Sequence, residues 1–200
     1  MSLDSAEPTS SRRALFGTAG AAGVAAAIAA LSTARPVAAA PPFSPTAADT
    51  ALLRQAMELE LAARDLYETT LAAGISDDVS QLIELLASNH NAYAKGIAGI
   101  AGLSADTPNQ EVFDQFEADF DTTDVEAWAR AANSLENTAA ATHTELMALY
   151  EAENAITFTA SVVMVEARAG VVTASIAGDS LEGALTPDAA ALELSGEASS

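Results

Sequence analysis

The chain repeats part of its own sequence at one constant spacing, and this repeat restricts the fold more than any other feature. Aligned without gaps, Leu59-Glu60 falls on Leu135-Glu136, and the Ile-Ala-Gly of 100–102 falls on that of 176–178. Alanine matches carry little weight because alanine is common in this chain, but the other matches hold across two separate segments. The repeat therefore predicts two related helix–helix hairpins.

Each hairpin contains two long segments in which apolar residues recur every three or four positions, the spacing of a helix with one buried stripe. In the first segment the stripe passes through Leu52, Leu59 and Leu66 and includes Glu60. The predicted long helices span about 49–73, 77 or 80 to 102, 124–154, and a start between 155 and 159 to 178. Glycines at 74, 102 and 178 follow three of these ends and favour termination there.

A shorter amphipathic helix is predicted over 111–120, between the two hairpins, because Val112, Phe116 and Phe120 fall on one side of it. Two hairpins joined by such a long crossover describe a four-helix bundle. The predicted fold class is therefore all-α, with the bundle occupying residues 49–178.

Composition excludes several classes of function. The 200 residues contain no cysteine, which excludes disulfides, thiolate metal sites and catalytic thiols. The net charge is −20, which argues against nucleic acid and against anionic membrane surfaces as partners.

Residues 1–40 have the pattern of an export signal. Arg12-Arg13 resembles the twin-arginine motif, an alanine-rich apolar run covers 15–31, and Val37–Ala40 offers small residues for a signal peptidase. A single membrane anchor is the alternative interpretation of the apolar run. We expect export by the twin-arginine route, localisation in the cell envelope or outside it, and no membrane contact after signal removal.

Two further segments flank the predicted bundle. Residues 41–48 contain three prolines and are expected to form an extended leader. Residues 179–200 are acidic and rich in small side chains, which is typical of a flexible tail. Within that tail, 187–194 is predicted to form a brief helix and 195–200 to be disordered.

Each long helix brings polar residues to its apolar stripe at a similar depth. These residues are Glu60 and Tyr67, His90 and Tyr93, Glu136 and His143, and Glu166. Carboxylates that converge in an apolar core require protons or a cation. Glutamate and histidine together suit iron, manganese or zinc. The alternatives left open are protonated or water-bridged acids and histidines that merely bond to a neighbour.

The chain resembles the ferritin-like superfamily over about 50–178, particularly the exported twin-arginine ferritin-like proteins of actinobacteria. That superfamily's dinuclear site takes one Glu from each of two helices and a Glu-x-x-His from each of the other two. The segments that carry the resemblance are Leu59-Glu60 with Tyr67, Leu135-Glu136 with His143, Val165–Ala169, and His90–Tyr93.

The chain departs from the superfamily's pattern at three ligand positions. Ala169 and Tyr93 stand where the pattern has histidine, and His90 stands where it has glutamate. The resemblance therefore implies one metal rather than two, and it does not favour di-iron oxidase chemistry. The implied ligands are Glu60, His90, Glu136 and Glu166, surrounded by Tyr67, Tyr93 and His143.

Two functions from different classes remain open. The first is an exported ferritin-like domain protein that binds a single iron, manganese or zinc ion in its core. The alternative is a metal-free ferritin-like scaffold with an interaction or assembly role, as a homo-oligomer or with a protein partner. No catalytic residue is predicted, and whether the protein is an enzyme is left open.

Overall fold

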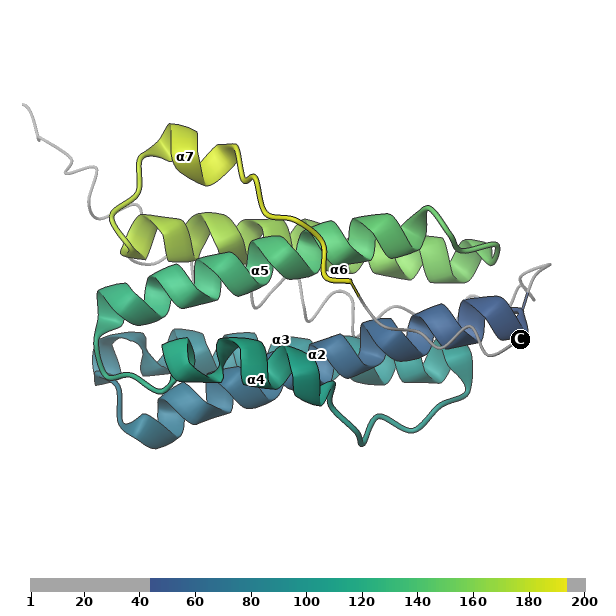
Figure 1. The fold of residues 1–200 in the computed structure, drawn as a ribbon, viewed down its shortest axis with the longest axis horizontal. Coiled ribbons are helices and arrows are strands. Elements are labelled where there is room, and N and C mark those ends of the chain that lie inside the picture. Colours follow the sequence, from purple (N-terminus) through teal and green to yellow (C-terminus); the bar gives the residue numbers. More distant parts are fainter. Residues whose placement is uncertain (1–43, 194–200) are drawn as a thin grey trace, which may run out of the picture. The chain divides into compact units, whose positions relative to one another are not determined.

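The computed structural model describes residues 44–193, which form six helices and no strand. The predicted signal at 1–40 and the expected disorder at 195–200 lie outside the described residues. The helices, labelled in Figure 1, are α2 (Ala47–Ala73), α3 (Asp77–Ala101), α4 (Gln110–Phe120), α5 (Val125–Met147), α6 (Glu153–Ile176) and α7 (Leu181–Leu185). The all-α fold class predicted from the sequence is confirmed.

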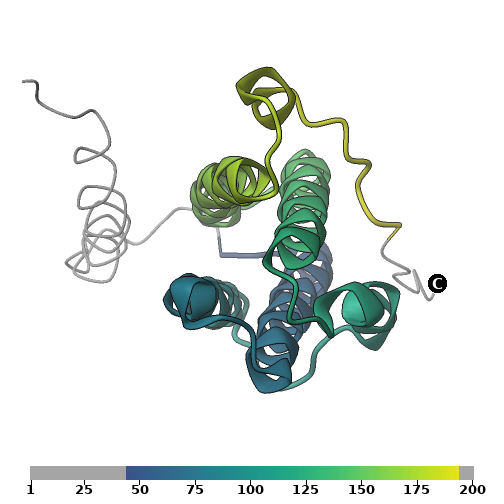
Figure 2. The ribbon, with the colours of Figure 1, turned by 90° about the vertical axis from the view of Figure 1, so that its left-hand side faces the viewer.

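The four long helices form two hairpins that pack on one another. α2 packs along α3, and α5 packs along α6, while α3 meets α6 and α2 meets α5 between the hairpins. Figure 2 looks along the bundle and shows the four helices around a common centre, with α4 outside α2 and α5. The short helix in the crossover therefore lies across the bundle, as the sequence predicted.

Glycines end two of the helices at the predicted positions. Gly74 follows α2 with a φ of 84°, and Gly102 follows α3 with a φ of 67°. Both values lie in the left-handed region that side chains with a Cβ disfavour, so glycine closes these helices at little cost. The turns that follow direct α3 back along α2 and lead the chain from α3 into the crossover.

The third long helix does not continue to residue 154, so this part of the prediction is wrong. α5 ends at Met147, and α6 begins at Glu153. Between them, the backbone N–H of Glu151 donates to Asp49 Oδ1 at 2.7 Å. Asp49 also completes the capping box that starts α2 with Thr46. The chain therefore leaves the helix in order to bind the first turn of α2.

The C-terminal segment also differs from the prediction. The brief helix expected over 187–194 is wrong: the helix is α7, and the described residues after it are not helical. Pro187 contributes to this difference, because proline disfavours helical backbone in the residue before it. Beyond Pro187, the backbone N–H of Leu192 donates to Thr142 Oγ1 of α5 at 2.9 Å, so this segment lies against the bundle.

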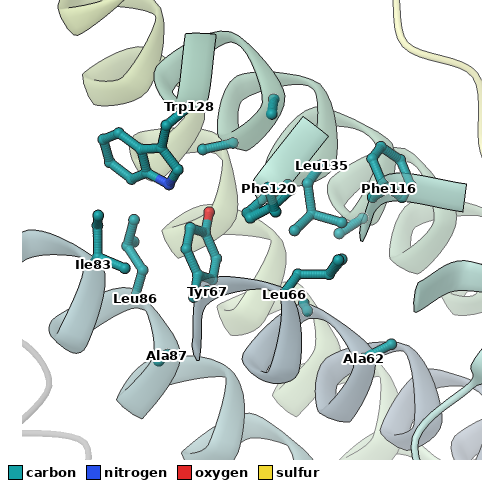
Figure 3. Close-up of a cluster of buried hydrophobic side chains, with 14 of the residues drawn as sticks. Ala62, Leu66, Tyr67, Ile83, Leu86, Ala87, Phe116, Phe120, Trp128 and Leu135 are labelled. Atoms are coloured by element: carbon teal, nitrogen blue, oxygen red, sulfur yellow. The ribbon is translucent and has the colours of Figure 1, made fainter. Parts of the chain in front are cut away.

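The core consists of two apolar clusters, one toward each end of the bundle. The first contains Tyr67, Phe120 and Trp128, which Figure 3 shows packed together. The second contains Leu53 and Ile97. Along every long helix the predicted site residues fall between members of the two clusters or beside them. Their members are listed here for the helix α3, where the order is Ile83, Leu86 and Ala87, then His90, then Ala94, Ile97 and Ala98.

Candidate metal centre

Each of the four long helices contributes at least one buried ionisable side chain to the middle of the bundle. α2 carries Glu60, α3 carries His90, α5 carries Glu136 and His143, and α6 carries Glu166. All five are at most 1% exposed. These residues lie on the buried stripe of their helices because their neighbours three and four positions away are apolar, so the fold carries them inward.

The five side chains form a continuous row in which carboxylates and imidazoles alternate. Glu136 Oε1 lies 3.2 Å from His90 Nε2, and His90 Nδ1 lies 2.7 Å from Glu60 Oε2. Glu60 Oε1 in turn lies 2.5 Å from His143 Nε2, which is 3.4 Å from Glu166 Oε1. Glu60 therefore joins the two imidazoles, and the row connects all four long helices.

Two tyrosines lie beside this row. The Tyr67 hydroxyl donates a 2.5 Å hydrogen bond to Glu136 Oε1, and its ring stacks on His90 with centroids 5.5 Å apart. The Tyr93 ring meets His90 edge-on at 6.0 Å, and its buried hydroxyl has no hydrogen-bond partner among the described residues. Burial and the nearby carboxylates raise the pKa of both tyrosines, so both are neutral.

The charges of the row largely compensate one another. Burial opposes ionisation of Glu60, but the His90 charge and hydrogen bonds from both imidazoles lower its pKa to about 2. Burial also opposes protonation of the imidazoles, yet Glu136 and Glu60 raise the pKa of His90 well above its usual range. The carboxylates of Glu166 and Glu60 likewise raise the pKa of His143 to about 10. Two imidazolium groups therefore balance most of the negative charge at neutral pH.

Glu166 is the least satisfied member of the row. Burial raises its pKa to about 7, opposed by the charge of His143 and assisted by those of Glu60 and Glu136. Both of its carboxylate oxygens are buried without a hydrogen bond among the described residues. Its ion-pair contact with His143 Nε2 is long, at 3.4 Å. A buried carboxylate in this state is a candidate ligand for a cation.

The residues fit one divalent cation. One ligand atom from each of Glu60, His90 and Glu166 lies within 4.8 Å of the others. Glu136 borders this group through His90 Nε2. One imidazole nitrogen with several carboxylate oxygens is a donor set that suits iron, manganese or zinc.

The residues do not fit a second cation with the ligands that a dinuclear site requires. Ala169 has no donor atom, and Tyr93 offers only a neutral hydroxyl at the position where the superfamily's pattern has histidine. His143 instead places an imidazole between Glu60 and Glu166. A single-ion site is therefore the only metal site that this donor set supports in the described part of the chain.

The structure places all seven residues that the sequence singled out in one buried region. Their relative importance differs from the expectation, because His143 was expected to surround the ligands and instead makes the 2.5 Å contact with Glu60. The repeat carried a signal for this, since it aligns His143 with Tyr67, the residue on the other hairpin that binds Glu136. Arg168, in contrast, is exposed.

The cavities found among the described residues do not reach this centre. One of about 620 Å³ lies between α2, α5 and residues 189–193, and one of about 200 Å³ lies beside α4. Neither is lined by a member of the row. The centre is thus enclosed by the bundle rather than open to a substrate pocket.

Comparison with protein families gives one result. A family model described as a ferritin-like domain matches residues 48–178. This range contains the four long helices and every residue of the row. No curated protein and no solved structure matches the chain.

Proposed function

The chain belongs to the ferritin-like domain family, and from this premise we propose that it is an exported protein that holds one divalent metal ion in its core. The ion is iron, manganese or zinc, bound by Glu60, His90 and Glu166, with Glu136 as the fourth ligand. The observation that supports this most is Glu166, whose two buried oxygens have no hydrogen bond and lie beside two other candidate ligands.

The surrounding residues would orient the ligands. Glu60 Oε2 holds His90 Nδ1 at 2.7 Å, which leaves His90 Nε2 directed toward Glu136. Such a carboxylate contact fixes the orientation of a metal-binding imidazole and raises its basicity. The Tyr67 hydroxyl holds Glu136 in the same way. A bound ion supplies a positive charge that ties the ends of the row together, and no catalytic residue is proposed.

The second candidate function is a metal-free scaffold with an interaction role. The observation that favours it is the pairing of His90 and His143 with Glu60, since two imidazolium groups stabilise the carboxylates without a metal. The two candidates differ in one measurable property, which is whether the row binds a cation in preference to protons.

Titration of the metal-free protein tests the proposal. We expect one equivalent of Zn²⁺, Mn²⁺ or Fe²⁺ to bind by calorimetry at pH 7, with release of protons, because a ligating imidazole must give up its proton. Glu60→Ala is expected to abolish binding, whereas Glu68→Ala, an exposed position on the same helix, should leave it unchanged. Equal binding by the wild type and Glu60→Ala would contradict the proposed ligands.

Export is the other part of the proposal. Replacing both Arg12 and Arg13 by lysine is expected to keep the protein in the cytoplasm, because the export receptor reads the arginine pair. Arg35→Lys makes the same chemical change outside the motif and should not affect export. Fractionation of cells that express each variant measures this, and normal export of the double variant would overturn the assignment.

A further inference from the structure

The outward side of α6 is apolar along almost its whole length. Ile156 is 38% exposed, Met164 is 56% exposed and Val172 is 43% exposed. Small side chains, Ala160 and Ala167, flank Met164 on the same side of the helix. In Figure 2, α6 lies at a corner of the bundle, beside α5 and α3. Among residues 44–193, α6 is the helix that is long and apolar enough to span a membrane.

This surface also lacks the acidic residues that dominate the rest of the chain. The net charge of the chain is −20, yet the only acidic residue between 154 and 178 is Glu166, which points into the core. The only basic residue there is Arg168. Two copies of a chain this acidic repel one another, and the outward face of α6 is the surface on which that repulsion is weakest.

We propose that this face binds a second copy of the chain, with the two α6 helices antiparallel across a two-fold axis at Met164. Ile156 and Val172 are equally spaced on either side of Met164, and at 100° per residue they lie on opposite flanks of it. A two-fold axis there sets Ile156 of one copy against Val172 of the other. The face is therefore self-complementary, as a two-fold interface must be.

The charges and the small residues are compatible with this arrangement. The two Arg168 side chains lie roughly 12 Å apart along the helix axes, beyond the screening length at physiological salt, so they do not oppose the contact. Ala160 and Ala167 leave room for the methionine of the facing copy. One helix of about 36 Å buries a small interface, so we expect a dissociation constant in the micromolar range.

A lipid surface fits the same face less well. An anionic membrane repels a chain with a net charge of −20. Insertion of α6 also requires the buried side of the helix, which carries Glu166, to leave the bundle. The surface does not depend on whether the core binds a metal, so its test is independent of the proposed function.

Sedimentation of the full-length chain from 1 to 500 µM tests the interface. We expect a reversible dimer, and Met164→Glu should raise its dissociation constant at least about tenfold, because it buries a charge at the centre of the contact. Leu181→Glu makes an equivalent change at a 71% exposed leucine on α7 and should have no effect. A wild type that stays monomeric throughout this range, or binding to neutral lipid vesicles by a monomer, would overturn the proposal.

Cross-linking tests the geometry, because the chain contains no cysteine of its own. Met164→Cys is expected to form a disulfide with itself under mild oxidation, since its two copies meet at the axis. Ile156→Cys and Val172→Cys should each fail alone but cross-link when mixed, because each faces the other residue. Cross-linking of Ile156→Cys with itself, or no cross-link in the mixture while Met164→Cys reacts, contradicts the antiparallel arrangement.

Discussion

Replacing His143 by alanine is expected to destabilise the metal-free protein at pH 7 by about 3–5 kcal/mol. His143 Nε2 lies 2.5 Å from Glu60 Oε1 and 3.4 Å from Glu166 Oε1, and its side chain is fully buried. Without this imidazolium, Glu60 and Glu166 share a dry region with no positive group between them. Urea unfolding of the metal-free wild type and variant measures the loss.

The same substitution is expected to make the fold depend more strongly on metal. A divalent ion replaces the lost positive charge, so one equivalent of Zn²⁺ should raise the melting temperature more in His143→Ala than in the wild type. His143→Gln separates the two contributions of the imidazole, because glutamine donates a hydrogen bond but carries no charge. Equal stability of the alanine variant and the wild type without metal would contradict the charge balance described for the row.

Replacing Glu166 by glutamine is expected to stabilise the metal-free protein at pH 8 by about 1–3 kcal/mol. Burial raises the pKa of Glu166 to about 7. A raised pKa in the folded state means that stability is fully present below about pH 4.5, the usual value, and is lost as the pH rises through 7. Glutamine is neutral at every pH and avoids this loss, so the two proteins should differ little at pH 4.

Saturating metal is expected to reverse the order of stability. A neutral amide is a poorer ligand for a divalent ion than a carboxylate, so the wild type gains more from the metal than Glu166→Gln does. Glu153→Gln changes an exposed glutamate on the same helix and serves as the control. Unfolding curves at pH 4 and pH 8, with and without Zn²⁺, test both signs. No dependence on pH would mean that Glu166 is solvated.

Glu136 is less informative for this test, although its sequence context resembles that of Glu60. The Tyr67 hydroxyl donates to it at 2.5 Å, and His90 Nε2 lies 3.2 Å away. Glu136→Gln therefore weakens charge-assisted contacts whether or not a metal is bound. Its effect is expected to be a loss in both states, so its sign does not separate a metal site from an empty one.

The sequence predicted the parts of this structure that depend on local pattern. The three-and-four spacing located the helices, Gly74 and Gly102 located two of their ends, and the repeat indicated that glutamates from both hairpins lie at one depth. The end of α5 was not predictable in this way. It depends on the bond between Asp49 and the backbone of Glu151, which are far apart in the sequence.

The arrangement within the row also required the structure. Helical spacing shows that Glu60, His90, His143 and Glu166 face inward, but it does not show which of them touch. The central position of His143 follows from how α5 rotates against α2, and packing across the interface between hairpins decides that rotation. The same limit applies to Glu166, whose lack of hydrogen bonds is visible only once its neighbours are placed.

Elemental analysis of the protein recovered after its own export tests the central claim most directly. The account predicts one iron, manganese or zinc ion per chain, removed by a chelator at acid pH and absent from Glu60→Ala purified in the same way. Protein that leaves the cell folded, with no metal in the wild type, would contradict the single-ion site. Two ions per chain would contradict it as well, because the described residues supply ligands for one.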